Sequence, residues 1–269
     1  MLKAISSLQN PLVKQILQLK EKSRGRRKSG LFVVEGYREI SLALQGGYRL
    51  TTVLFQPDIL TEERVTALLK GAGTDTEVIR LSGEVYERLA YRSTTEGILA
   101  MGKVRENALS GLSFARPDPL ILVAEAPEKP GNIGALLRTA DAAGLDAVLI
   151  ANPKTDLYNP NIIRSSLGCV FTTPVATGKT PEILAFLKER DIAVYCAALT
   201  ASVPYHTVDF KPAAAIVVGT EDEGLGDIWL HNATENILIP MQGVIDSMNV
   251  SAAAAVLIFE AKRQRGFSS

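Results

Sequence analysis

Long apolar runs, cysteine and histidine are all scarce in this chain of 269 residues. No stretch approaches the roughly 18 consecutive apolar residues of a membrane span, and residues 1–14 lack the basic patch and apolar core of a signal segment. Cys169 and Cys196 are too few for a disulfide framework and have no companion at metal-ligand spacing. We therefore expect two buried thiols, no metal, no membrane contact and a cytoplasmic location. His206 and His231 stand alone, and we expect neither to be functional.

Charge is unevenly distributed although its sum is zero. Up to Arg105 there are 17 basic and 11 acidic residues, against 12 and 18 in the remainder. This asymmetry predicts that the first half meets a polyanion. The densest basic cluster comprises Lys20, Lys22, Arg24, Arg26, Arg27 and Lys28. It is either a solvated loop or a surface that contacts phosphates, and charge alone does not choose between them.

Helices and strands alternate in the first hundred residues. The hydrophobic pattern predicts helices at 11–20, 37–45, 62–70 and 83–89, and strands at 31–34, 52–55, 77–81 and 97–104. The periodicity is lost between about residues 105 and 119. We therefore expect a small α/β domain over 1–105, a linker over 106–118 and a second domain over 119–269.

The second domain shows a different α/β pattern, because its strands are apolar throughout. We expect strands at 120–124, 147–150, 192–196, 214–219 and 236–239, and helices at 132–143, 161–166, 181–190 (with Thr180 as N-cap) and 248–263. Such strands indicate a parallel sheet covered on both faces. Ligands of such sheets bind beyond the carboxyl ends of the strands.

Three loops at these strand ends are unusual. In residues 130–140, Gly131 and Gly134 permit close backbone approach and Arg138 lies about one turn beyond Gly134, although a plain strand-to-helix turn with an exposed arginine fits equally. Residues 219–225 carry three consecutive acids between glycines, as a solvated turn also could. Residues 239–251 place Ser247 and Asn249 before an alanine-rich helix, where backbone donors and small polar side chains can meet a ligand.

Together, the three loops resemble the signature of the SpoU/TrmH family of RNA 2′-O-ribose methyltransferases, in the SPOUT superfamily. The family pattern N-x-G-x-x-x-R-x-A falls on residues 132–140, G-x-E-x-x-G on 219–224, and I-P-M-x-G-x-x-x-S-x-N-V-S on 239–251. The resemblance covers the whole second domain. The first domain resembles the substrate-binding module that precedes many such enzymes, with the sequence Phe-Val-Val-Glu-Gly at 32–36 as its most typical element.

The resemblance implies a fold and a reaction. It implies a parallel-sheet SPOUT domain with a trefoil knot, preceded by a small α/β, ribosomal-protein-like RNA-binding domain, in a homodimer with the site near its interface. It further implies transfer of a methyl group from S-adenosylmethionine to a ribose 2′-hydroxyl of structured RNA. Large-subunit ribosomal RNA suits the leading domain better than transfer RNA, since that domain could grip a structured stem by phosphate and shape contacts.

Site residues follow from the same resemblance. The catalytic positions are Arg138, Glu221, Ser247 and Asn249. The positions that bind S-adenosylmethionine are Gly219, Thr220, Glu221, Gly224, Ile239, Pro240, Met241, Met248 and Ser251. The expected RNA contacts are Asn132, Arg164 and, from its charge, the basic cluster at 20–28. Residues 164–168 match a common family stretch, but a capped surface helix fits them equally. The sequence departs from the family at Lys129, Thr220 and Met248; the last two keep a hydroxyl and apolar volume, and Lys129 bears mostly on which RNA is recognised.

The role of Arg138 stays open at this point. Family mechanisms assign it the removal of the hydroxyl proton, yet an arginine normally stays protonated, so stabilisation of the developing alkoxide is equally reasonable. Two rival functions also remain. A non-catalytic RNA-binding protein of the same fold would not need the intact Arg138, Ser247 and Asn249. A Rossmann-type enzyme would need a G-x-G-x-x-G fingerprint, which is absent.

Overall fold

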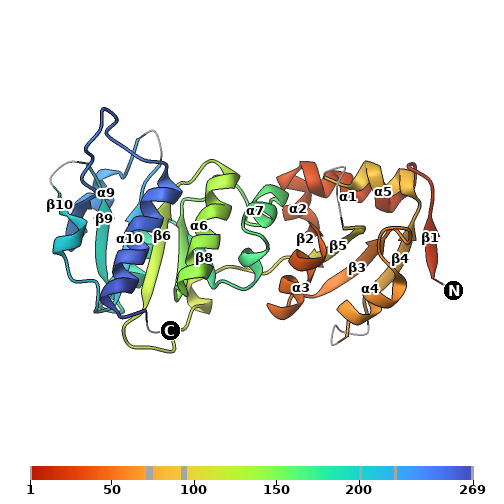
Figure 1. Cartoon of the computed structure of the whole chain (residues 1–269), viewed down its shortest axis with the longest axis horizontal. Helices are drawn as coiled ribbons and strands as arrows, with labels where there is room; N and C mark the ends of the chain where they lie inside the picture. Colours follow the sequence, from red (N-terminus) through yellow and green to blue (C-terminus); the bar gives the residue numbers. More distant parts are fainter. Residues whose placement is uncertain (1, 71–74, 92–95, 200–201, 221–222, 268–269) are drawn as a thin grey trace. The chain divides into compact units, whose positions relative to one another are not determined.

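The computed structural model describes residues 2–70, 75–91, 96–199, 202–220 and 223–267 (Figure 1). The chain forms two compact units. Unit 1 comprises Met1–Glu106 and Asp156–Thr172, and unit 2 comprises Asn107–Thr155 and Thr173–Ser269. Residues 156–172 therefore belong with unit 1, whereas the sequence-based division placed them in the second domain.

Unit 1 is built on a five-stranded mixed sheet. Its strands are β1 (Lys3–Ile5), β2 (Leu31–Glu35), β3 (Leu50–Phe55), β4 (Glu77–Leu81) and β5 (Ile98–Lys103), in the order β1-β4-β3-β5-β2. Strands β1, β4 and β3 are parallel, and β5 is antiparallel to β3 and β2. The helices are α1 (Pro11–Glu21), α2 (Ser23–Ser29), α3 (Tyr37–Gln45), α4 (Glu62–Leu68), α5 (Gly83–Leu89), α7 (Pro160–Ser165) and the 3-10 turn η2 (Cys169–Phe171).

Helix α1 shows why the local pattern was predictable. Asn10 caps it by accepting a hydrogen bond from the Leu12 N–H at 2.9 Å, and Pro11 occupies the first helical position. Val13, Ile16 and Leu19 recur every three residues and are buried against the sheet.

An aromatic cluster fixes the segment 156–172 in unit 1. The Phe32 ring stacks on Tyr158 with centroids 5.1 Å apart, and the Tyr48 ring meets Phe171 edge-on at 5.0 Å. The Tyr158 hydroxyl also accepts from the Arg105 N–H at 2.9 Å. Such contacts between distant segments leave no signal in hydrophobic periodicity.

Unit 2 contains a seven-stranded sheet in which every pairing is parallel. Its strands are β6 (Leu120–Glu125), β7 (Ala147–Ala151), β8 (Val175–Gly178), β9 (Ala193–Ala197), β10 (Val203–Pro204), β11 (Ala214–Val218) and β12 (Glu235–Leu238), in the order β10-β12-β9-β11-β6-β7-β8. The helical elements are η1 (Leu109–Gly111), α6 (Pro130–Ala143), α8 (Thr180–Lys188), η3 (Tyr205–Thr207), α9 (Asp227–Leu230) and α10 (Val250–Gln264).

Side chains alternate between the two faces of this sheet. Ile121 and Val123 pack in one cluster with Phe186 of α8 and Trp229 of α9. Their neighbours along β6 point to the opposite face, where α6 and α10 lie together (Figure 1). The predicted parallel sheet with both faces covered is therefore confirmed. The two cysteines are free and buried, as expected.

Several local expectations were wrong or incomplete. Lys179, not Thr180, occupies the N-cap position of α8, because the Thr180 hydroxyl donates to Glu125 at 2.8 Å instead. In the basic cluster, residues 24–28 lie on helix α2, Lys20 lies on α1 and Lys22 lies between the two helices, so the alternative of a solvated loop does not hold. The short strands β1, β8 and β10 and helix α9 were not predicted. Within the described residues, no helix is long and apolar enough to cross a membrane.

Candidate active site

A pocket of about 520 Å³ lies at the carboxyl ends of three neighbouring strands of unit 2. These strands are β9, β11 and β12, which are adjacent in the sheet although far apart along the chain. The loops that follow them contribute Leu199, Gly219 and Ile239 to the wall, and Ala253 of α10 closes one side. The lining is largely apolar, with hydroxyl and carboxylate groups from Thr220, Ser247 and Asp246. Pockets of this size and make-up suit a nucleoside-containing ligand.

Two residues of the segment that follows β11, Thr220 and Gly224, pair through their backbones at the pocket edge. The Thr220 N–H donates to the Gly224 carbonyl at 3.0 Å and the Gly224 N–H donates back at 3.2 Å. Gly224 has a φ of +68°, in the left-handed region. A Cβ on Gly219 would stand 2.2 Å from the carbonyl carbon of Gly224, so residue 219 must be glycine for the turn to close.

The first and third motifs meet at the starts of two helices. Asn249 is the N-cap of α10, and its Oδ1 accepts from the Ser251 N–H at 3.0 Å. Its Nδ2 donates to Oδ1 of Asn132, in the first turn of α6, at 3.4 Å. The Nδ2 of Asn132 is buried and has no partner among the described residues.

Arg138 lies on α6 and is exposed. It is not among the described residues that line the pocket. No hydrogen bond or ion pair joins its guanidinium to another described residue, and so the charge is available to a ligand. The structure thus brings Ser247 to the pocket and Asn249 to its border, but does not bring Arg138 into it.

The predicted donor-binding positions divide into three groups. Gly219, Thr220, Gly224, Ile239, Met241 and Met248 line the pocket. Pro240 and Ser251 do not line it. The N–H and the hydroxyl of Ser251 both donate to Oδ1 of Asn249. Glu221 lies outside the described residues. Sequence reasoning missed Ala197, Leu199, Leu225, Asp246 and Ala253, whose places depend on strand order and loop packing.

Glu125 was also missed, although it ties the loops of this sheet edge together. It ends β6, and its carboxylate accepts from the Trp229 indole N–H at 2.6 Å, the Thr180 hydroxyl at 2.8 Å and the Asn152 amide at 2.8 Å. Trp229 is fully buried and follows the 219–225 loop, so this carboxylate helps to fix that loop. The feature of the sequence that could have identified Glu125 is an acidic residue at the end of an apolar strand.

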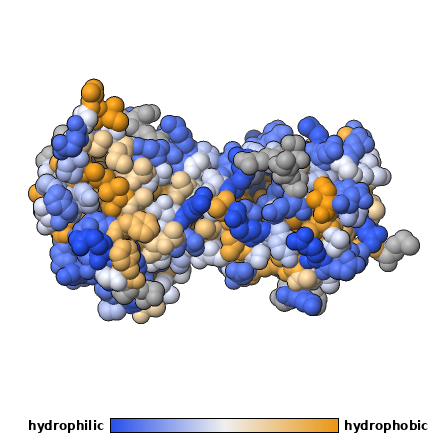
Figure 2. All heavy atoms as spheres, viewed as in Figure 1, coloured by the Kyte–Doolittle hydropathy of each residue, from blue (hydrophilic) through white to orange (hydrophobic). Residues whose placement is uncertain are grey.

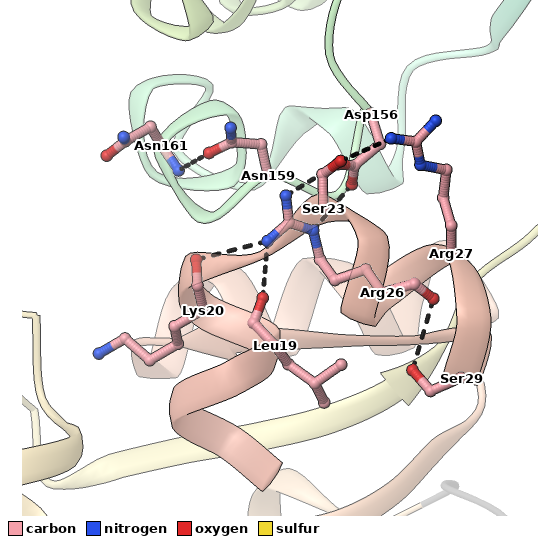
Figure 3. Close-up of polar contacts among 9 residues, drawn as sticks. All are labelled: Leu19, Lys20, Ser23, Arg26, Arg27, Ser29, Asp156, Asn159 and Asn161. Atoms are coloured by element: carbon pink, nitrogen blue, oxygen red, sulfur yellow. Dashed lines mark hydrogen bonds and ion pairs between the residues drawn. The ribbon is translucent and has the colours of Figure 1, made fainter. Parts of the chain in front are cut away.

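The basic cluster of unit 1 separates into exposed and buried members. Arg24, Arg27 and Lys28 are exposed on α2, and Lys22 is exposed at the position that precedes this helix. Arg26 is only 2% exposed. Its guanidinium forms a bidentate ion pair with Asp156, at 2.9 and 2.7 Å, and also donates to the Leu19 carbonyl at 2.6 Å (Figure 3). Arg26 therefore anchors the segment 156–172, and its buried guanidinium is not available for the expected contact with RNA.

Lys20 and Arg164 flank one aromatic ring. The Lys20 ammonium lies 5.0 Å from the Tyr91 ring centroid, and the Arg164 guanidinium lies 4.6 Å from it. Burial lowers the pKa of Lys20, and nearby Glu35 opposes that shift. Lys20 is thus engaged within unit 1, whereas Arg164 keeps an exposed side chain.

Comparison with known proteins decides the family. Residues 119–259 match the SpoU rRNA Methylase family, and residues 10–100 match the MRM3-like substrate binding domain. The chain belongs to the SpoU rRNA Methylase family. Among its relatives, the 23S rRNA (guanosine(2553)-2′-O)-methyltransferase RlmP of Bacillus subtilis is 31% identical over 96% of this chain and 98% of its own length.

Solved structures agree with this membership. A crystal structure described as an RNA 2′-O ribose methyltransferase has a TM-score of 0.83 and 38% identity, and covers 97% of this chain and 99% of its own. The AdoMet-bound rRNA methyltransferase from Sinorhizobium meliloti has a TM-score of 0.88 and 27% identity, over 97% and 98% of the two chains. The SpoU likeness thus extends over both units.

Proposed function

We propose that this SpoU protein transfers a methyl group from S-adenosylmethionine to a ribose 2′-hydroxyl of structured RNA, with large-subunit ribosomal RNA as the favoured substrate. The observation that carries the proposal is the pocket at the ends of β9, β11 and β12, where Gly219, Met248 and Ser247 meet. A relative matching nearly the full chain is a 23S rRNA 2′-O-methyltransferase, which supports ribosomal over transfer RNA.

The residues present fit S-adenosylmethionine. The apolar wall, with Leu199, Ile239 and Met248, suits an adenine ring, and the Cβ-free edge at Gly219 lets a ligand approach the backbone. Asp246 provides a carboxylate within the lining, which suits a ligand that carries positive charge. When bound, the donor supplies an electrophilic methyl group. Among the described residues, no cluster of three or more His, Cys, Asp or Glu is arranged to hold a metal ion.

The reaction is an in-line displacement, in which the ribose 2′-oxygen forms a bond to the methyl carbon as the bond from carbon to sulfur breaks. The hydroxyl proton leaves in the same process and passes to a phosphate oxygen of the substrate RNA and from there to solvent. Holding the oxygen in line within a dry pocket contributes several kcal/mol to such a reaction. We assign that positioning to Ser247 and Asn249, and we assign to Arg138 the stabilisation of the developing negative charge on oxygen, because its guanidinium stays protonated.

The proposed assembly is a pair of identical chains. Val244 and Ile245, in the loop between β12 and α10, are exposed. This loop forms the top of unit 2 in Figure 1, and Figure 2 shows apolar atoms there. Phe259 is also exposed, on α10. Exposed apolar groups of this kind mark contact surfaces. We propose a homodimer through α10, a trefoil knot formed by the loops at 219–225 and 239–251, and a cytoplasmic enzyme.

Labelled S-adenosylmethionine tests the proposal with RNA from a strain that lacks the protein. We expect label in large-subunit RNA with the wild type and none with Arg138→Ala. Label confined to transfer RNA would identify a tRNA methyltransferase instead. RNA binding without any label, also on ribosomal precursor particles, would identify a non-catalytic binding protein.

A further inference from the structure

Unit 1 contains a cavity of its own, of about 200 Å³. Val33 of β2 and Pro160 and Ile163 of α7 form its apolar wall, and three carboxylates from Glu35, Glu39 and Glu96 reach it. It shares no residue with the pocket of unit 2. A single water needs only ~10–15 Å³ of such volume, so the cavity has room for a larger group.

A fixed aromatic ring stands at this cavity. Tyr91 is 43% exposed, yet it is held at both ends. Its hydroxyl donates to Asn161 at 2.9 Å, and its backbone N–H donates to the Glu35 carboxylate at 2.8 and 3.0 Å. The planar Arg164 guanidinium lies against the ring. Tyrosine and arginine planes are the surfaces on which unstacked RNA bases lie.

Among the described residues, no hydrogen-bond donor engages one of the carboxylates at the cavity, that of Glu39. Glu35 is engaged by Tyr91, and Glu96 accepts from the Tyr37 N–H. Glu39 is about nine-tenths buried, and among the described residues it has only an ion pair with Arg38, at 3.6 Å. Glu39 lines the cavity, and its carboxylate oxygens are not among the fully buried unpaired atoms, so they open to the cavity and can accept N–H groups from a ligand.

Gly36 makes the space that this carboxylate occupies. A Cβ on Gly36 would stand 2.3 Å from Oε2 of Glu39, and the φ of Gly36 is +108°. Any other residue would displace the Glu39 carboxylate. The glycine and the glutamate therefore form one arrangement, which leaves an acceptor at the cavity.

We propose that this cavity binds one unstacked guanine of the substrate RNA, apart from the nucleotide that is methylated. Guanine presents adjacent N1–H and N2–H donors, which match the two oxygens of one carboxylate. No other base has two adjacent donors on this edge, because adenine and cytosine place an acceptor beside their donor and uracil has an acceptor on each side of its donor. The Arg164 guanidinium, which lies against the Tyr91 ring, supports the base with its other face, and Glu39 contacts the edge of the base. The inference rests on the proposed RNA substrate, but methyl transfer itself uses the pocket of unit 2.

Inosine interference tests this assignment, because inosine lacks the N2 amine of guanine. Large-subunit ribosomal RNA transcripts, each with inosine in place of a few guanines, are sorted in two separate experiments. The first recovers the transcripts that bind the full-length protein, and the second recovers the transcripts that it methylates. With the wild type, we expect the recovered transcripts to contain less inosine at one guanine position, which is not the methylated nucleotide. Glu39→Gln should abolish that depletion and raise the RNA KM roughly tenfold, the size expected for one bidentate base contact. Its kcat and its KM for S-adenosylmethionine should be unchanged.

Two further variants make the result specific. Glu87→Gln makes the same charge change at an exposed site on α5 outside the cavity and should behave as the wild type. Arg164→Lys keeps the positive charge but removes the planar guanidinium, and should also raise the KM for RNA. An unchanged inosine pattern and KM in Glu39→Gln would overturn the inference while methylation persists. If inosine is depleted among the bound transcripts but no transcript is methylated, the proposed function alone is overturned. If the protein binds no RNA, both the proposed function and this inference are overturned.

Discussion

The amide of Asn249 donates to the side-chain oxygen of Asn132 at 3.4 Å and so joins the starts of α10 and α6. The same Asn249 caps α10 by accepting from the Ser251 N–H. One side chain therefore serves both helix stability and the alignment of two motifs. These two functions respond differently to substitution.

Asn249→Asp separates the two functions. An aspartate still caps α10 but cannot donate to Asn132, so we expect normal stability and at least a tenfold loss of methyl transfer. Asn249→Ala loses both, with about 1 kcal/mol less stability from the missing cap. Thermal unfolding and transfer rates measure the two effects. Full activity in Asn249→Asp would show that the contact with Asn132 is unimportant.

Gly219→Ala tests the backbone turn at the pocket. The added Cβ would stand 2.2 Å from the Gly224 carbonyl carbon, so the turn must open. We expect the affinity for S-adenosylmethionine to fall more than tenfold in calorimetric titration. Gly111→Ala is the matched control, because nothing lies within 4 Å of its added Cβ. Equal affinities in the two variants would contradict the assignment of the pocket.

The ion pair between Arg26 and Asp156 predicts a large effect on stability. Removing one partner of a buried pair costs about 3–5 kcal/mol, because the other charge stays buried. Arg26→Met should show this loss in denaturant unfolding. The double variant Arg26→Met with Asp156→Leu should recover part of it. Wild-type stability in the single variant would argue against a structural role for Arg26.

The exposed members of the basic cluster predict the opposite pattern. Arg24→Ala and Lys28→Ala should leave the free energy of unfolding unchanged and weaken RNA binding. Each should also reduce the slope of log affinity against log salt concentration by about one. Binding titrations at several salt concentrations measure this slope. Unchanged slopes would mean that α2 does not contact phosphates.

The proposed dimer predicts a change of mass. Phe259→Glu should yield a monomer in light scattering, because it places a charge on the apolar surface of α10. Phe267→Glu alters an exposed phenylalanine just beyond the end of α10 and should remain dimeric. A dimer that survives Phe259→Glu would move the interface elsewhere.

How far the sequence predicted the fold depends on the range of the signal. Helix α1 and the parallel strands follow from local periodicity and caps, which the chain carries in adjacent residues. The placement of 156–172 depends on Phe32 meeting Tyr158, which periodicity does not encode. The burial of Arg26 likewise follows from Asp156, 130 positions away.

The candidate site was predictable to the same extent. The motifs identified Gly219, Met248 and Ser247, because each lies within a recognisable loop. Leu199 enters the pocket only because β9 lies between β12 and β11, and strand order is not a local property. Glu125 acts through Trp229, a contact between residues far apart in sequence.

The position of the transferred methyl group tests the central claim most directly. RNA labelled by the wild-type protein is hydrolysed with alkali, which cannot cleave beside a 2′-O-methylated ribose. We predict that the label is recovered in one alkali-resistant dinucleotide from large-subunit ribosomal RNA. Label recovered in mononucleotides would place the methyl group on a base and contradict transfer to the 2′-hydroxyl.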